Sequence, residues 1–286
     1  MMRRFTLIQG GLSEPACPDP AVEDPAGLAP AAIEVDLRAA PGVDAEAVAA
    51  WRALMTRTGV QDPFQDPDYL LTAARHQAAG QRVAFALAWS RPARGPAALH
   101  GVLPLRITRP LLGRDRAHPW QPPGLSGAST VEHAHTDAVL EAVRARLLGL
   151  ARPVHLVTPA DPDAPGAEAP PSPVRAVEGR RRSIPASSLL GVRPEGYRPE
   201  SVEHVRDPAL VRDAVETFLA LDARTARRPI IADPADAAMV RVVSRLFARR
   251  RQIGIELARQ GGTVVSGTLH LGTGPRAVAW RHAAGH

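Results

Sequence analysis

The end of the chain decides the fold class, and its central stretch reads Gly262-Thr-Val-Val-Ser-Gly-Thr-Leu-His-Leu271. Its residues follow a period of two, which is typical of a β-strand. Stretches 254–258 and 276–282 share this period, and the short glycine-containing segments 260–262 and 272–275 connect the three. Because such segments are typical of hairpin turns, the sequence predicts an antiparallel meander here.

Two helical patterns and one short strand precede the meander. Segments 207–221 and 234–250 place apolar residues three and four positions apart, which is the spacing of one buried helix face. Pro208 fits the first helical turn, where its missing N–H is not needed. Residues 202–205 are predicted to form a strand before these helices.

The first part of the chain predicts a similar mixture of elements. Helices are expected from Asp44 to Met55 and from about Asp66 to His76. A hairpin follows over 82–89 and 99–107, then a long loop over 109–135, a helix over 136–150 and a short strand over 154–157. Together the patterns predict an α/β (α+β) fold with a mixed, mostly antiparallel sheet flanked by helices.

Composition shifts divide the chain into four regions. Residues 1–45 are interpreted as an N-terminal tail, in which only 31–37 resembles a strand. Residues 46–158 form a first half, 159–180 a linker rich in Pro, Ala and Arg, and 181–286 a second half.

Charge and composition favour a globular protein without a membrane span. The chain has 286 residues, 45% hydrophobic and 22% charged, and a net charge of +6. All 35 basic residues are Arg, which indicates codon bias, and aromatic residues make up only 4%, so stacking platforms for nucleic acid are scarce. We expect no nucleic-acid partner. Because 1–12 is too short and broken for a secretory signal, we predict a cytoplasmic location.

Four pieces of sequence, taken in order, resemble the acetyltransferase domain of the CelD-like, cellulose-biosynthesis-type branch of the GNAT acyltransferases, which is related to the FemAB-type tandem GNAT proteins. The resemblance covers about residues 46 to 286. The pieces are Trp51–Leu54 with Asp62–Tyr69, Gly101–Leu105, Phe218–Asp222 with Arg249–Gln252, and Ile255–Leu257 with 261–267 and 279–284.

This resemblance implies two GNAT-like halves and acyl transfer from acetyl-CoA, or another acyl-CoA, to an amine. The acceptor would be a small molecule or a glycan precursor used in polysaccharide or cell-envelope biosynthesis. Two departures bear on activity. Segment 223–229 lacks the Trp, Lys and Gly of the relatives, and the second half is expected to end after its central strand, without the pyrophosphate loop and helix. The alternative is a catalytically silent binding or scaffold protein that self-associates through an exposed edge strand.

Candidate site residues lie in both halves. By resemblance, His282 is the candidate general base and Trp280 an aromatic wall on the same strand face, while Phe64, Tyr69 and Arg281 are candidate substrate contacts. His270 is a weaker candidate base, and no residues are assigned to the cofactor.

The close histidine pair His133-Ala-His135 offers two potential ligands for a metal ion. In a strand both rings would point to one side, but a third ligand such as Glu132 or Asp137 would be needed. The surrounding Gly, Ser and Ala indicate a loop, so we predict no metal.

Overall fold

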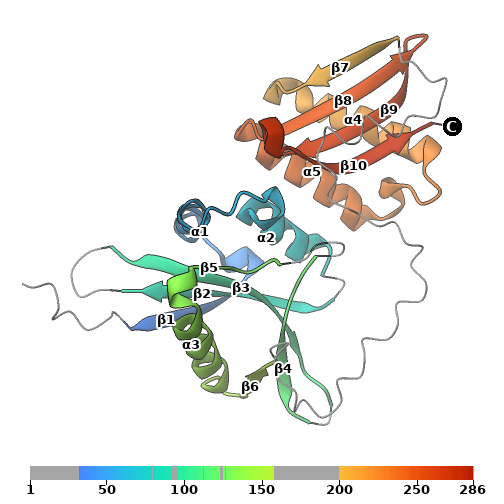
Figure 1. The fold of residues 1–286 in the computed structure, drawn as a ribbon. Coiled ribbons are helices and arrows are strands. Elements are labelled where there is room, and N and C mark those ends of the chain that lie inside the picture. The colour runs from blue at the N-terminus through green and yellow to red at the C-terminus, as the bar shows by residue number, and fades with distance from the viewer. Residues whose placement is uncertain are drawn as a thin grey trace, which may run out of the picture. The chain divides into compact units, whose positions relative to one another are not determined.

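The structure is a computed structural model that describes residues 32–157 and 200–285, apart from Ala79, 92–95, Leu112, 123–124 and Ser126. It confirms the predicted class: a mixed α+β fold with mostly antiparallel sheets flanked by helices (Figure 1). The predicted linker 159–180 and most of the predicted tail lie outside the described residues.

The first sheet is mixed. Its main strands follow the order β1-β2-β3-β4-β6, and the two-residue β5 pairs with β3. Among strand pairs of the described residues, β4 with β6 is the single parallel one. The strands are β1 (Ile33–Ala39), β2 (Arg82–Ser90), β3 (Ala98–Thr108), β4 (Asp115–Pro119), β5 (Thr130–Val131) and β6 (Val154–Leu156).

Helices cover both faces of this sheet, as Figure 1 shows. They are α1 (Ala45–Arg57), α2 (Pro67–His76) and α3 (Thr136–Leu148). Strand β2 is buried on both sides because its alternate residues enter two cores: Phe85 and Leu87 join the cluster of α1 and α2, whereas Ala86 joins that of α3.

The second sheet is fully antiparallel, in the order β10-β9-β8-β7, which confirms the predicted meander. Asp207 and Asp233 cap the two helices by accepting hydrogen bonds from first-turn N–H groups. The elements are β7 (Ser201–Val205), α4 (Pro208–Thr225), α5 (Pro234–Arg249), β8 (Ile253–Gln260), β9 (Thr263–Leu271) and β10 (Val278–Ala284).

The two halves repeat one order of elements. Strand, two helices and three strands recur as β1-α1-α2-β2-β3-β4 and as β7-α4-α5-β8-β9-β10, and the four strands lie in the same order within each sheet. The first half continues with β5, α3 and β6. A crossover helix is needed at this point because β4 and β6 are parallel.

Two predicted boundaries are wrong. The strand expected over 31–37 is present as β1, but it belongs to the sheet rather than to the tail, because it pairs with β2 over its whole length. The predicted loop 109–135 contains β4 and β5. Strand β4 shows no apolar alternation, since its buried residues are Ala117 and the carboxylate of Asp115, which forms ion pairs with two arginines, Arg109 and Arg152.

Candidate functional site

A β-bulge positions the first residue of the candidate site. Ala88 pairs with Gly101 and Trp89 pairs with Leu99, so His100 is the extra residue of β3. A bulge re-aims a side chain and interrupts the ladder. The side chain of His100 is 14% exposed, and its Nε2 lies 2.7 Å from Oγ of Ser90, the last residue of β2.

Glu132 reaches the same place from the loop after β5. Strand β5 pairs with β3 next to the bulge, and the N–H of Glu132 donates to the carbonyl of His100 at 2.9 Å. The side chain then turns back, so that Oε2 of Glu132 lies 2.5 Å from Nδ1 of His100. Main chain and side chain thus fix the two residues against each other.

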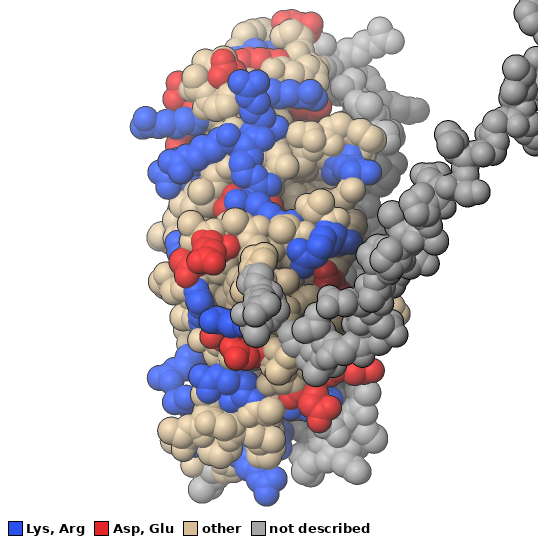
Figure 2. All heavy atoms as spheres, turned by 90° about the vertical axis from the view of Figure 1, so that its left-hand side faces the viewer, with Lys and Arg blue, Asp and Glu red and all other residues tan. Residues whose placement is uncertain are grey.

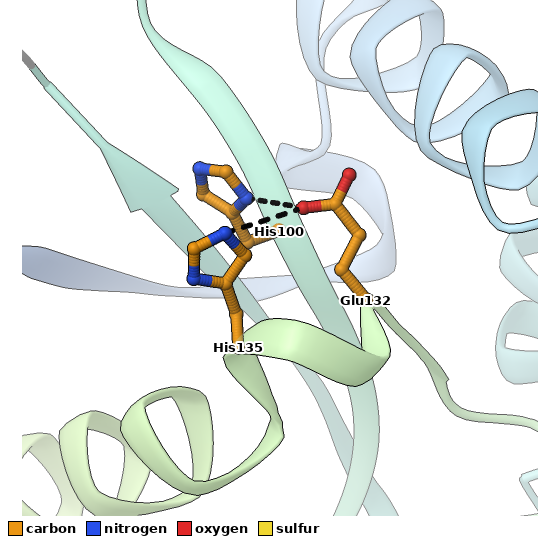
Figure 3. Close-up of side chains that lie close together, drawn as sticks. All are labelled: His100, Glu132 and His135. Atoms are coloured by element: carbon orange, nitrogen blue, oxygen red, sulfur yellow. Dashed lines mark hydrogen bonds and ion pairs between the residues drawn. The ribbon is translucent and has the colours of Figure 1, made fainter.

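His135 completes the cluster through a short 3₁₀ helix (His133–His135) that leads into α3. This helix has about three residues per turn, so residues three apart lie above one another. His135 therefore lies over Glu132, with Nε2 3.8 Å from Oε2, and its ring centroid is 4.2 Å from that of His100. Figure 3 shows both imidazoles facing the carboxylate.

Arg57 at the end of α1 balances the charge of Glu132. Its Nε donates to Oε1 at 2.7 Å, and its Nη2 donates to the carbonyl of Leu99 at 2.6 Å. Burial raises the pKa of Glu132, but the hydrogen bonds from Arg57 and His100 outweigh it and hold this pKa below its usual value. Glu132 is therefore a carboxylate at neutral pH.

These contacts fix the direction of the hydrogen bonds in the neutral ring. An ionised carboxylate only accepts, so Nδ1 of His100 donates to Glu132 and Nε2 accepts from the hydroxyl of Ser90. A serine hydroxyl, a histidine and a carboxylate that are hydrogen-bonded in this order can activate the hydroxyl or remove a proton from a substrate.

The predicted base and aromatic wall of the second half do not share a strand face. A bulge makes Trp280 the extra residue of β10, because Ala279 pairs with His270 and Arg281 with Leu269. The expected alternation is therefore wrong. Trp280 is 5% exposed and lies in the core, whereas His282 is exposed and its Nδ1 lies 3.0 Å from Oγ1 of Thr268.

The predicted substrate contacts pack against the same core. Phe64 and Tyr69 meet edge to face at 5.0 Å, and Tyr69 meets Trp280 in the same way at 5.9 Å. Arg281 is largely buried and forms an ion pair with Asp236 at 3.5 Å. The structure thus brings Tyr69 and Trp280 together as packing residues. Whether any of these residues contacts a substrate stays a prediction.

The two histidines of His133-Ala-His135 lie in the same 3₁₀ helix but do not belong to the same cluster. Only His135 joins the cluster, and Asp137 is not part of it. The expectation of a common side for the two rings applied only to a strand; the residues instead form a 3₁₀ helix, in which residues two apart diverge. The sequence pointed to Glu132 and His135 but not to Ser90 and His100, because the contact between these two depends on strand pairing and on the bulge in β3.

His270 and His204 flank a second polar site on the sheet of the second half. Both rings lie 3.5 Å from an oxygen of Glu256, across β7, β8 and β9. They line a hollow of about 560 Å³ together with Arg206. This site is more open than the cluster around His100, because the side chain of Glu256 is 44% exposed and that of His204 is 57% exposed.

Comparison with known proteins adds no family assignment: no model of a protein family matches the chain, and no curated protein is significantly similar to it. The resemblance to CelD-like acetyltransferases therefore stays a prediction. Within the described residues, no helix is long and apolar enough to cross a membrane.

The arginine-rich surface carries both signs of charge. On the face drawn in Figure 2, acidic side chains lie between the basic ones. Several arginines are paired, among them Arg241 with Glu216 and Arg259 with Glu203. Such pairing reduces the field that would attract a polyanion, in line with the prediction of no nucleic-acid partner, which stays a prediction.

Proposed function

We propose that this protein is an acyltransferase that moves an acyl group from an acyl-CoA to an amine, with its proton acceptor in the first half. The observation that carries the proposal is the hydrogen-bonded chain Ser90–His100–Glu132 beside the start of α3. The resemblance to CelD-like acetyltransferases supplies the donor and the acceptor class, including a glycan-precursor amine in the cytoplasm.

The start of α3 is the proposed place for the anionic part of such a donor, with Asp137 of the first turn as an opposing charge. This helix crosses between the parallel strands β4 and β6, and its N-cap residue His135 makes no side-chain hydrogen bond to the first turn. The N–H groups of a helix start and the helix dipole favour phosphate. The sequence predicted that the second half lacks such a helix; in the first half α3 follows β4 after β5 and a 3₁₀ helix, and we propose that it serves this purpose.

The chemical step needs one base and one leaving group. The amine gives its proton to Nε2 of His100 through the hydroxyl of Ser90, and Glu132 stabilises the imidazolium that forms. The amine nitrogen bonds to the thioester carbon, and the carbon–sulfur bond breaks. The CoA thiolate leaves and takes the proton back from His100, so charges and protons balance.

Calorimetric titration of the folded chain with acetyl-CoA, followed by a thiol-release assay with a panel of amines, tests the proposal. We expect saturable binding and an amine-dependent rate. His100→Gln should lower that rate roughly 100-fold or more, which is the usual range for loss of a general base. His155→Gln on β6 is the matched control outside the cluster.

Two outcomes would count against the proposal. A folded chain that binds no acyl-CoA would favour the alternative of a silent scaffold protein of the same fold. Loss of rate in His282→Gln, with His100→Gln active, would move the base to the second half.

A further inference from the structure

We propose that His100, Glu132 and His135 form a binding site for one divalent transition-metal ion of the zinc type. One ligand atom from each residue lies within 4.8 Å of the other two. Nδ1 of His100 and Nε2 of His135 are the nitrogens that face Oε2 of Glu132. Figure 3 shows the three side chains converging: His100 from β3, Glu132 from the residue before the 3₁₀ helix, and His135 from the end of that helix. This site shares His100 and Glu132 with the proposed proton relay, but the inference does not require acyl transfer to be correct.

The donor set fits zinc better than magnesium or calcium. Two imidazoles and one carboxylate are a ligand set of zinc sites that keep a fourth position open, whereas hard cations prefer oxygen ligands alone. Zinc bonds of about 2.0–2.1 Å place ligand atoms roughly 3.4 Å apart in a tetrahedron. The two distances to Oε2, 2.5 Å from His100 and 3.8 Å from His135, lie on either side of that separation.

Small movements therefore suffice to admit the ion. The metal takes the place of the proton between Nδ1 of His100 and Oε2 of Glu132, and these two atoms move apart. The side chain of His135 is 42% exposed, so it has room to approach from the solvent side. Glu132 stays anchored by its N–H, which donates to the carbonyl of His100.

The surroundings supply the outer contacts that metal ligands require. A ligating histidine normally donates its other N–H to a partner, and a ligating carboxylate is itself hydrogen-bonded. Ser90 is in place to accept from Nε2 of His100, and Arg57 donates to Oε1 of Glu132, the oxygen that does not face the histidines. The positive charge of Arg57 opposes the ion, so we expect moderate rather than very tight affinity.

Metal binding and the proposed proton relay exclude each other. With the metal on Nδ1, the neutral ring of His100 carries its proton on Nε2 and no longer accepts from Ser90. If the chain transfers acyl groups as proposed, Zn²⁺ should therefore inhibit it. Direct binding measurements separate the two proposals, because they do not depend on activity.

The test titrates the chelator-treated full chain with ZnCl₂ by calorimetry and with CoCl₂ by visible absorption. We expect one ion per chain and the intense cobalt bands of a tetrahedral site. His135→Ala should weaken binding roughly tenfold or more. The matched control is His133→Ala, because this histidine lies on the same 3₁₀ helix but outside the cluster.

A second variant probes the outer contact. Ser90→Ala removes the partner of Nε2 but no ligand atom, and loss of such a contact typically weakens binding by about 10–100-fold. Circular dichroism should show that each variant is folded. Absence of saturable binding by the wild-type chain, or equal binding by wild type and His135→Ala, would overturn the proposal.

Discussion

The two halves share one order of elements but place their bulged residues in opposite surroundings. In the first half the extra residue is His100, which faces a carboxylate, a hydroxyl and a second imidazole. In the second half the matching bulge between β8 and β9 leaves Val265 as the extra residue, and a further bulge leaves Trp280 of β10, which enters the apolar core. The matching bulges lie on the third strand of each half, so the frame fixes where a side chain is re-aimed, whereas the residue there, His100 or Val265, decides whether a polar cluster can form.

The added elements of the first half account for the rest of the difference. Strand β5 and the 3₁₀ helix before α3 bring Glu132 and His135 to the bulge. In the described part of the second half no element follows β10, and the carboxylate that meets His204 and His270 there is Glu256, on a neighbouring strand. A carboxylate delivered by a loop can be enclosed by Arg57 and His100, but one on an open sheet face stays exposed.

The largest expected effect on the free energy of unfolding comes from truncating Trp280, the packed bulge residue of β10. Trp280→Ala removes a side chain that is 5% exposed and contacts Tyr69, so it should lower the free energy of unfolding by about 3–5 kcal/mol. Urea denaturation measures this loss. If Trp280 instead forms a substrate wall, as the resemblance implied, the loss should be below about 1 kcal/mol and acyl-CoA or acceptor binding should change instead.

A smaller loss of stability should come from substituting either of two glycines, each of which lies where a helix approaches the third strand of its half. A Cβ on Gly101 of β3 would lie 2.8 Å from Cγ1 of Val139 in α3, and one on Gly267 of β9 would lie 3.0 Å from the ring of Phe218 in α4. Val139 is buried and β-branched, so its side chain has little freedom to yield.

We therefore expect Gly101→Ala to destabilise the protein by about 1–3 kcal/mol. Gly267→Ala should lower the free energy of unfolding by less, because the added Cβ would lie farther from Phe218 than that of Gly101→Ala from Val139. Thermal unfolding of the two variants, side by side, measures the difference. The reverse order would mean that α3 can shift away from β3, and that the site next to Gly101 is less rigid than its hydrogen bonds indicate.

Sequence patterns predicted the helices and the hairpins because these elements follow regular periods. The helix over 44–55 and the meander of the second half were found within a few residues of their observed ends. Strand β4 was missed because its burial depends on an ion-paired Asp115, and a carboxylate resembles a loop residue in any hydrophobic pattern.

The site was only half predictable for a related reason. Glu132 and His135 are near neighbours in sequence and were weighed together as ligands, although no metal was predicted. Their partner His100 is brought to them by the pairing of β5 with β3 and by a bulge, which are tertiary features. Periodic patterns in one sequence do not reveal that His100 and Glu132, which are 32 positions apart, are in contact.

The smallest expected effect concerns pH and compares the fourth strands of the two halves. Burial lowers the pKa of His118 in β4, with help from Arg106 and Arg116. Partial burial also lowers the pKa of His282 in β10, opposed by a backbone hydrogen bond with Gly267 and assisted by His270. Both rings are therefore harder to protonate in the folded state than in the unfolded state, where the pKa is about 6.5.

The free energy of unfolding should therefore decrease on acidification. As pH falls below about 6.5, the unfolded chain binds protons before the folded chain does, so the stability present at neutral pH is lost progressively until the lower pKa values of the folded state are passed. NMR titration of the imidazole protons should give midpoints below about 6.5 for both residues. His118→Gln and His282→Gln should each flatten the decline of unfolding free energy between about pH 7 and pH 5. A midpoint at or above the ordinary value for His118 would show that β4 is more open to water than its pairing with β3 and β6 implies.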